Sequence, residues 1–214
     1  MSEPNLLLVC IKQETIDFSM KHIKGIIFDL DGTLVSCDLC FKTMREAIGC
    51  PLDEDILAFV DSLSDEQKIV ANQTIRDLEL KDAHSANWIK GAKEFITYLN
   101  RSQLPLAIVT RNSKEPSDIK INNNNISIKT IITRDDAPAK PDPTALLNLS
   151  KEWQIAPDNI LYIGDYLHDI NIAKNAGALS ALFCENEIPD YAHQADYVFT
   201  CYFELLNLFK EAHS

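Results

Sequence analysis

Short apolar runs alternate with amphipathic segments along most of this chain. Six runs are rich in aliphatic and β-branched residues and are bounded by turn formers, a pattern typical of buried strands. They lie at residues 26–29, 106–109, 130–132, 160–163, 179–183 and 197–199. Between the runs, apolar residues recur at helical spacing at residues 92–100, 144–153, 169–175 and 202–211. This alternation predicts an α/β fold: a Rossmann-like parallel sheet with helices on both faces.

One stretch breaks the alternation. Residues 37–88 contain no strand pattern but three helical ones, at residues 39–48, 53–62 and 65–84. Ser64 is followed by Asp65, Glu66 and Gln67, which is the pattern of a capping box at a helix start. We therefore expect a small all-helical insertion after the first strand. The predicted division is an N-terminal extension at residues 1–23, a core at 24–36 and 89–214, and a helical cap at 37–88.

Three smaller signals complete the local predictions. Gly177 stands where a helix C-terminal cap is expected. The four asparagines at residues 122–125 favour a turn or solvated loop between the second and third strands. The apolar residues 6–11 follow no basic segment and fall far short of the roughly 20 residues that span a bilayer, so they predict a short strand or a packed arm.

Composition and charge narrow the function classes. The chain has 214 residues, 46% of them hydrophobic, which suits one core domain with an insertion. Its net charge of −12 comes from acidic residues spread along the sequence, so neither nucleic acid nor an anionic membrane is an expected partner. A phosphate site in such a chain needs positive charge from placed basic residues or a divalent cation.

Six cysteines raise the question of disulfides. No secretory signal precedes them and a chain of this length does not need covalent staples, so we expect reduced thiols in a cytoplasmic protein. Cys37 and Cys40 have the spacing of a redox pair or half a metal site. No second pair or run of histidines completes such a motif, and their role is left open.

The segment FDLDGTL at residues 28–34 carries the first chemical signal. It places Asp29 at the end of a buried strand, where open parallel sheets bind their ligands. A carboxylate there can act as a nucleophile, and Asp31 can transfer protons as a general acid and base. Gly32 allows the tight turn. The alternative is an ordinary turn in which these side chains bond the local backbone.

Three later segments lie at or just beyond predicted strand ends. They are VTRN with Thr110, AKPDP with Lys140, and GDYLHD with Asp165 and Asp169. Alone, each has an ordinary explanation: a β-forming threonine, a solvated lysine before proline, or acids that cap a helix. Together, parallel topology would bring them to one edge of the sheet.

From Lys24 onward, these four segments in this order resemble the motifs of the haloacid dehalogenase superfamily. The chain is most similar to phosphoglycolate phosphatase-like members with a small helical cap of the C1 type. The resemblance implies a Mg²⁺-dependent hydrolase that cleaves a small phosphorylated metabolite through an aspartyl phosphate. Asp29 would be the nucleophile and Asp31 the acid and base.

The resemblance also implies the remaining site residues. Mg²⁺ would be held by the Asp29 side chain, the Asp31 backbone carbonyl and Asp165, with Asp169 in support, an all-oxygen set that suits a hard cation. Lys140 and Thr110 would bind the transferring phosphoryl group. No other cofactor is implied.

Further candidate residues lie around the motifs. Arg111 and Asn112 are candidate substrate contacts. Arg111 and Arg134 either are solvated or paired with acids, or they grip a second anionic group. His168 is expected to be a helix-start residue rather than a ligand.

Asp31 also separates the alternatives. Dehalogenases of the superfamily lack this second acid, so its presence favours phosphate esters over haloacids. A sugar phosphomutase and a non-catalytic binding scaffold remain competing functions. The predicted insertion is shorter than the usual cap, which predicts a less enclosed site. Substrate selectivity would lie mainly in the insertion, where residues such as Arg45, Lys68 and Arg76 look like an ordinary charged surface and point to no particular substrate.

Overall fold

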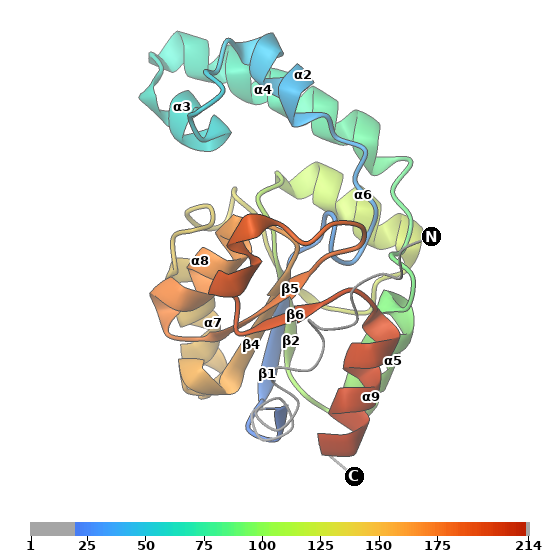
Figure 1. Cartoon of the computed structure of the whole chain (residues 1–214). Coiled ribbons are helices and arrows are strands. Elements are labelled where there is room, and N and C mark those ends of the chain that lie inside the picture. Colours follow the sequence, from blue (N-terminus) through green and yellow to red (C-terminus); the bar gives the residue numbers. More distant parts are fainter. Residues whose placement is uncertain (1–19, 213–214) are drawn as a thin grey trace, which may run out of the picture.

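A six-stranded parallel sheet forms the centre of the computed structural model, which describes residues 20–212 (Figure 1). Its strands are β1 (Gly25–Phe28), β2 (Leu106–Val109), β3 (Thr130–Ile132), β4 (Ile160–Gly164), β5 (Leu179–Phe183) and β6 (Tyr197–Phe199). They lie in the order β3-β2-β1-β4-β5-β6, and every neighbouring pair is parallel. The predicted α/β fold with a Rossmann-like sheet is confirmed.

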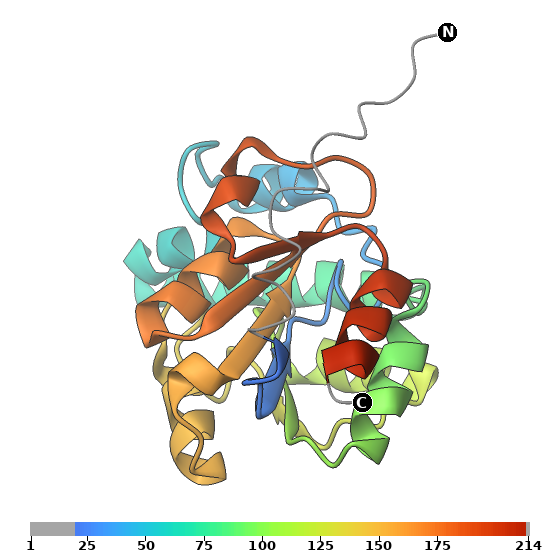
Figure 2. The ribbon, with the colours of Figure 1, turned by 60° about the horizontal axis from the view of Figure 1, so that its bottom comes forward.

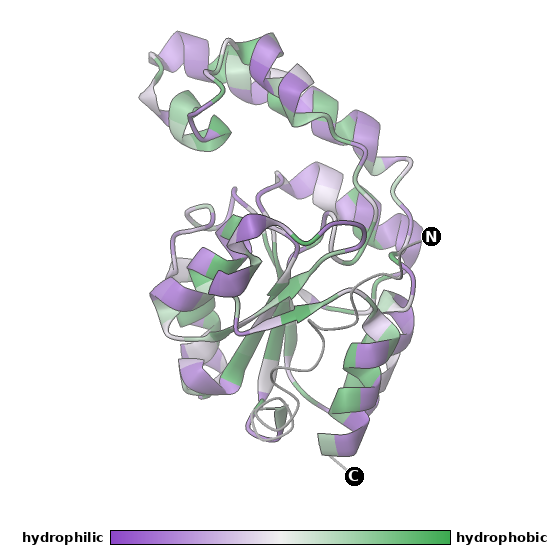
Figure 3. Cartoon of the chain, in the orientation of Figure 1, coloured by the Kyte–Doolittle hydropathy of each residue, from purple (hydrophilic) through white to green (hydrophobic). Residues whose placement is uncertain are grey.

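Helices cover both faces of this sheet (Figures 1 and 2). They are α5 (Ala92–Arg101), α6 (Lys114–Asn124), α7 (Thr144–Trp153), α8 (Leu167–Ala176) and α9 (Tyr202–Ala212), with 3₁₀ turns η1 (Pro157–Asn159) and η2 (Asp190–Gln194). Alternate residues of β1 point to opposite faces. Ile26 and Phe28 pack in the cluster that includes α5 and α9, whereas Ile27 packs with α7 and α8. Among the described residues, the strands are coloured mostly as hydrophobic (Figure 3).

Three further helices follow β1 and stand together beyond the sheet, on the side of α6 (Figure 1). They are α2 (Phe41–Ile48), α3 (Ile56–Ser62) and α4 (Asp65–Ala83). Met44, Val60 and Ile75 belong to a separate apolar cluster within this helical insertion. Gln67 accepts hydrogen bonds from the backbone and hydroxyl of Ser64, at 3.4 and 3.0 Å, as the capping pattern predicts. The insertion therefore has a core of its own.

The largest differences from the predicted segments lie at α3 and at the asparagine run. Helix α3 begins at Ile56 rather than at residue 53, because the Asp55 side chain accepts the N–H groups of Leu57 and Ala58 and so caps the helix. The loop predicted at the asparagine run is wrong: residues 122–124 form the last turn of α6, and only Asn125 leaves the helix, at φ 51°.

Helix α6 escaped prediction because its sequence carries helix-breaking residues at its ends. Pro116 lies in the first turn, where a backbone N–H has no helical partner to lose. Gly177 caps α8 in the left-handed conformation at φ 75°, as expected. Residues 6–11 lie outside the described part of the chain. Among residues 20–212, no helix combines the length and apolar character needed to cross a bilayer.

Candidate active site

The first carboxylate lies directly after β1. The strand ends at Phe28, one residue earlier than predicted, but the backbone N–H of Asp29 still donates to the Ile163 carbonyl at 2.8 Å. The Asp29 Oδ1 atom accepts the Leu30 N–H at 2.7 Å and lies 2.8 Å from Lys140 Nζ. The sheet and these contacts therefore fix Asp29 at the carboxyl edge.

The turn after Asp29 packs closely against the end of β4. Gly32 adopts φ 68°, and a Cβ atom there would lie only 2.4 Å from Asp165 Oδ2. The Thr33 hydroxyl donates to Asp165 Oδ1 at 3.1 Å. Glycine is therefore required at this turn both by its left-handed backbone and by the approach of a carboxylate.

Lys140 joins the first and last motifs. It is buried, and its Nζ atom lies 2.8 Å from Asp29 and donates to Asp169 Oδ1 at 2.7 Å. The other Asp169 oxygen accepts the backbone N–H groups of Asp165 and Tyr166 at the start of α8, at 3.2 and 3.0 Å. Asp169 is thus held by a helix N-terminus and in turn holds the lysine.

Three carboxylates face this one ammonium. Asp29, Asp165 and Asp169 each offer an oxygen, and the three oxygens lie within 4.8 Å of one another. Burial raises the pKa of Asp29 to about 7, with Asp169 adding to the rise and Lys140 opposing it. Burial, followed by repulsion from Asp169 and Asp29, also raises the pKa of Asp165 well above its usual value. The raised pKa values indicate that the cluster lacks enough positive charge to keep all three carboxylates ionised, and its all-oxygen donors fit a hard divalent cation.

Thr110 lies where predicted, just beyond β2. Phe28 pairs with Ile108 across the sheet, so Thr110 follows the end of the strand beside β1. Its N–H donates to the Ile132 carbonyl at 3.0 Å, and its buried hydroxyl accepts the Asn112 N–H at 3.2 Å. The hydroxyl is therefore part of the β2 turn as well as a candidate phosphoryl ligand.

Asp31 lies in a different environment from Asp29. Its Oδ2 atom accepts the Asn112 side-chain amide at 2.7 Å, and its Oδ1 atom accepts Lys120 Nζ at 2.6 Å. Asn112 is buried and occupied by this contact. Its assignment as a substrate contact stays a prediction, while its observed contact is with the candidate acid.

Sequence reasoning missed Lys120 and its second partner, Asp82 of α4. Lys120 Nζ donates to Asp82 Oδ2 at 2.6 Å, and the lysine is fully buried. Burial lowers the pKa of its ammonium, but Asp31 and Asp82 together outweigh that effect and raise it. The only signal was a lysine between two isoleucines, in a helix that was itself not predicted.

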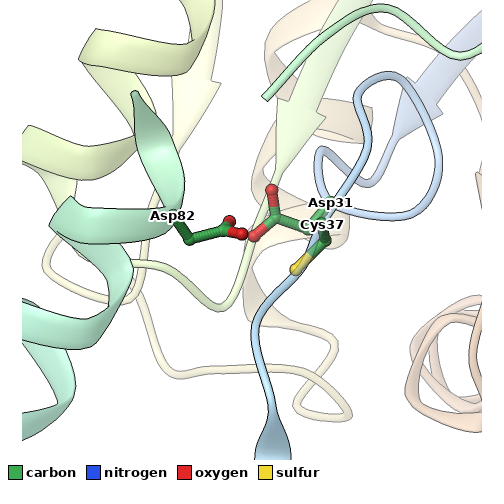
Figure 4. A group of neighbouring side chains, drawn as sticks. All are labelled: Asp31, Cys37 and Asp82. Carbon is green, nitrogen blue, oxygen red and sulfur yellow. The ribbon is translucent and has the colours of Figure 1, made fainter. Parts of the chain in front are cut away.

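Cys37 lies near the carboxylates of Asp31 and Asp82 (Figure 4). Burial, with repulsion from Asp31, raises the pKa of its thiol to about 12, so the sulfur stays protonated. The Lys120 ammonium lies between the two carboxylates and offsets part of their charge. Cys37 and Cys40 form no disulfide, and the same holds for the other cysteines within residues 20–212. This cluster is therefore a lysine-bridged acid pair with a neutral thiol beside it.

The two arginines are paired with acids of the helical insertion. Arg111 Nη2 donates to both Asp55 oxygens, at 2.8 and 2.7 Å, and Arg134 contacts both carboxylate oxygens of Glu79. His168 lies in the first turn of α8, as expected, and its Nε2 atom is 3.2 Å from Asp55. Asp55 and Glu79 had no signal in the sequence, because their partners come from distant segments.

A groove of about 970 Å³ lies along the border of α3 and α4 with α6. Its charged lining includes Arg76, Lys114, Glu115, Asp118, Arg134 and Asp135. None of the predicted catalytic or metal-binding residues lines it. The groove belongs to the junction between insertion and core rather than to the acid cluster.

A family model described as haloacid dehalogenase-like hydrolase matches residues 38–183. The chain belongs to this family. An uncharacterised hydrolase of Saccharomyces cerevisiae is 31% identical over 170 residues, covering 76% of this chain and 78% of the relative. A phosphoglycolate phosphatase of Vibrio vulnificus is 29% identical over 192 residues, covering 76% and 84%. The predicted relationship to phosphoglycolate phosphatase-like members of the superfamily is thus confirmed, as is the prediction of an enzyme.

The fold of this haloacid dehalogenase-like hydrolase agrees with that of solved relatives. A hydrolase from Pseudomonas syringae superposes with a TM-score of 0.75 at 24% identity, over 88% of this chain and 98% of the other. At this identity the likeness concerns the fold. It supports the sheet order and the strand ends on which the acid cluster is built.

Proposed function

We propose that this hydrolase is a Mg²⁺-dependent phosphatase that cleaves a small phosphomonoester through an aspartyl phosphate on Asp29. One observation carries the proposal: two acids two residues apart lie in different environments. Asp29 lies among the carboxylates of Asp165 and Asp169, whereas Asp31 is held by Asn112 and Lys120. Asp29 thus faces the cluster that fits a cation, which when bound would favour its ionised, nucleophilic form, whereas Asp31 is oriented separately and can serve as the proton donor.

In the first step, a carboxylate oxygen of Asp29 attacks phosphorus. A bond forms between that oxygen and phosphorus, and the bond from phosphorus to the ester oxygen breaks. Asp31, in its protonated form, gives its proton to the departing oxygen. The products are a free alcohol, the aspartyl phosphate on Asp29 and the Asp31 carboxylate.

In the second step, water attacks the phosphorus of this intermediate. The Asp31 carboxylate takes a proton from the water, the bond from phosphorus to the Asp29 oxygen breaks, and inorganic phosphate leaves. Asp31 is then protonated and Asp29 is ionised, as at the start. The cycle consumes one water for each ester.

Charge on the transferring group has to be balanced in both steps. Lys140 Nζ lies 2.8 Å from Asp29 Oδ1 and can turn from the carboxylates toward an oxygen of the phosphoryl group. The Thr110 hydroxyl can donate a hydrogen bond to a second phosphoryl oxygen. Asp29, Asp165, Asp169 and the Asp31 carbonyl would hold Mg²⁺, which when bound neutralises charge on the phosphoryl oxygens. The raised pKa values of Asp29 and Asp165 support a cation at this site.

The substrate class rests on the insertion and on the relatives. We propose that residues 37–88 act as a cap that selects the leaving group, on a core formed by residues 24–36 and 89–214. Arg111 is engaged by Asp55 and by the Lys140 carbonyl, so its proposed contact with substrate requires the insertion to move. The Vibrio relative is named a phosphoglycolate phosphatase, and phosphoglycolate is a small phosphorylated acid. Its name therefore supports a metabolite of that size as the substrate of this chain.

The test is hydrolysis of p-nitrophenyl phosphate by the purified chain, with Mg²⁺ and then with excess EDTA. We expect release of p-nitrophenol that EDTA abolishes and added Mg²⁺ restores. Asp29→Asn should remove the activity, while Asp38→Asn, an exposed acid nearby, should retain it. Activity that survives both EDTA and Asp29→Asn would count against the mechanism.

The competing phosphomutase function is separated by a second assay. A hexose 1-phosphate is supplied, and free phosphate and the 6-phosphate are both measured. A hydrolase releases phosphate in proportion to the substrate lost. A mutase instead yields the 6-phosphate with little free phosphate, because the intermediate returns its phosphoryl group to the sugar.

A further inference from the structure

Lys120 is a fully buried lysine between two carboxylates. Its Nζ atom lies 2.6 Å from Asp31 Oδ1 and 2.6 Å from Asp82 Oδ2, and its exposed fraction is 0%. Burial of an ammonium is costly unless opposite charges compensate it. The two carboxylates provide that compensation, and Figure 4 shows them pointing toward one another. Without Lys120 they would repel.

On the core side, Lys120 completes a pair of donors that fixes Asp31. Lys120 holds Oδ1 and the Asn112 amide holds Oδ2, each at hydrogen-bond distance. Both donors come from the segment that follows β2, so one piece of the core grips both oxygens. Rotation of the Asp31 side chain away from its present position would break both contacts.

On the other side, Lys120 is held by the base of the insertion. Asp82 lies in the last turn of α4, and its Oδ1 atom accepts the N–H of Asp38 at 2.8 Å, in the linker that enters the insertion. This linker pairs with the returning one, where Ser36 N–H donates to the Asn87 carbonyl at 2.7 Å. Asp82 therefore connects the lysine to the point at which the insertion joins the core.

We propose that Lys120 is a positioning residue that aims Asp31 at the leaving oxygen, with Asp82 holding the lysine in place. The inference rests on the proposed function, in which Asp31 is the proton donor. Lys120 itself touches no reacting atom. Its effect is to keep the Asp31 carboxyl group in one orientation, and its link to Asp82 makes that orientation depend on the base of the insertion.

This role predicts a dependence on the leaving group. A departing p-nitrophenolate is stable without a proton, whereas a departing phenolate is much more basic and gains more from a proton donor. A misplaced Asp31 should therefore slow the hydrolysis of phenyl phosphate more than that of p-nitrophenyl phosphate, and the two esters differ only by the para nitro group. Because kcat/KM reports the steps up to leaving-group departure, the comparison is made on kcat/KM.

The main variant is Lys120→Met with Asp82→Asn, which removes the ammonium and the repulsion together and so protects folding. Lys120→Arg is the conservative variant, and Asp31→Asn defines complete loss of the proton donor. Lys114→Met is the matched control, since Lys114 lies on the same helix with its side chain 61% exposed. Each protein is checked for its melting temperature and far-ultraviolet circular dichroism before kinetics.

A general acid contributes about 10²–10⁴-fold, so the double variant should lose roughly tenfold or more in kcat/KM for phenyl phosphate relative to p-nitrophenyl phosphate. Asp31→Asn should shift the ratio in the same direction and at least as far, and adding the Lys120 substitution to it should change the ratio no further. Lys120→Arg should shift the ratio less than the double variant does, because it keeps a positive charge beside Asp31. Lys114→Met should give the wild-type ratio.

Two results would overturn the assignment. An unchanged ratio in the double variant means that Lys120 serves only stability, even if both rates fall. A ratio that shifts equally in Lys114→Met means that the effect is not specific to the bridge. If the wild type hydrolyses neither ester with Mg²⁺, the proposed function itself fails; if it hydrolyses both and only the ratio is unmoved, the failure is confined to Lys120.

Discussion

Arg111 of the core and Asp55 of the helical insertion form a two-pronged contact beside the candidate active site. Arg111 Nη2 donates to both Asp55 oxygens at 2.8 and 2.7 Å, and its Nη1 atom donates to the Lys140 carbonyl. His168 adds a third contact, with Nε2 3.2 Å from Asp55. Each of these core residues is a candidate site residue or adjoins one in the sequence. A single carboxylate thus ties the insertion to the edge of the site.

Replacing Asp55 by Asn should loosen this contact without unwinding α3. The Asn side chain can still accept the N–H groups of Leu57 and Ala58, but it loses the charge that attracts Arg111 and His168. Charge-assisted hydrogen bonds contribute about 1.5–3 kcal/mol, so we expect roughly tenfold or faster limited proteolysis within linker residues 36–40 and 84–88.

The matched control for this change is Asp53→Asn, an exposed acid in the same loop. It should be cleaved at the wild-type rate. Equal cleavage of the Asp55 variant and the wild type would show that the insertion is held by its other contacts with the core. Because Asp55→Asn preserves the helix cap, we expect it to change the melting temperature much less than the rate of cleavage.

A second prediction concerns pH and metal. The pKa of Asp29 is raised from 3.8 to about 7, first by burial. Below about pH 4 the Asp29 carboxyl is neutral in both the folded and the unfolded chain. Between about pH 4 and pH 7 it is ionised in the unfolded chain but remains largely protonated in the folded one. Asp29 therefore lowers the free energy of unfolding of metal-free protein as pH rises, and this loss is complete once pH passes about 7.

In EDTA, Asp29→Asn should accordingly gain stability over the wild type at pH 8 but not at pH 4. The rise in the Asp29 pKa from 3.8 to about 7 corresponds to about 4 kcal/mol at most, so at pH 8 the variant should melt several degrees above the wild type. Mg²⁺ should raise the wild-type melting temperature at pH 8 and have a smaller effect on the variant. An equal response to Mg²⁺ in both proteins would place the cation away from Asp29.

The residues at strand ends show best how much of the candidate site can be predicted from the sequence. Asp29, Thr110 and Asp165 each follow a run of buried apolar residues, and parallel topology alone brings such positions to one edge. Their proximity could therefore be predicted from the sequence, as could the helical insertion and the capped start of α4. The prediction was possible because each of these residues lies at a fixed, short distance along the sequence from the end of a predicted strand.

The contacts between insertion and core were not predictable, for a different physical reason. Lys120 meets Asp82 across 38 residues, and Arg134 meets Glu79 across 55. Whether a charged helical residue is solvated or buried depends on how two units pack, and local spacing is the same in both cases. Lys120 also lies in helix α6, which was not predicted because its asparagines and its proline are typical of turns and loops.

The pairs along this border provide a third prediction, because one is buried and another exposed. Glu79 and Arg134 have exposed side-chain fractions of 4% and 11%, against 52% for Glu115 and 47% for Arg76. Glu79→Gln leaves the Arg134 charge without its partner in a buried place, which costs about 3–5 kcal/mol. Glu115→Gln should cost only about 0–1 kcal/mol.

Urea unfolding of both variants measures these costs. Glu79→Gln should lower the free energy of unfolding by several times more than Glu115→Gln, although both residues lose the same charge at the same border. Similar losses in the two variants would mean that water reaches Arg134 once Glu79 is changed. The Ser113 hydroxyl, which donates to Glu79 at 2.9 Å, can still donate to the amide oxygen and does not explain a difference.

A fourth prediction compares the same added methyl group at two strand glycines. A Cβ atom on Gly164 would lie 2.2 Å from Asp169 Cγ, whereas one on Gly25 would lie 2.9 Å from the Trp153 ring at the opposite end of the sheet. Gly164→Ala must push Asp169 away from Lys140 and from the start of α8. Gly25→Ala disturbs only core packing.

Gly164→Ala should therefore lower kcat/KM for p-nitrophenyl phosphate by about 100-fold per folded molecule, since displacement by about 1 Å is enough for such a loss. Gly25→Ala should lose about 1–3 kcal/mol of stability by overpacking but keep its activity per folded molecule. Kinetics normalised to the folded fraction, with unfolding curves for both variants, decide between these outcomes. If Gly164→Ala kept full activity, Asp169 would not be needed in its present position, and the support it gives to Lys140 would have no part in turnover.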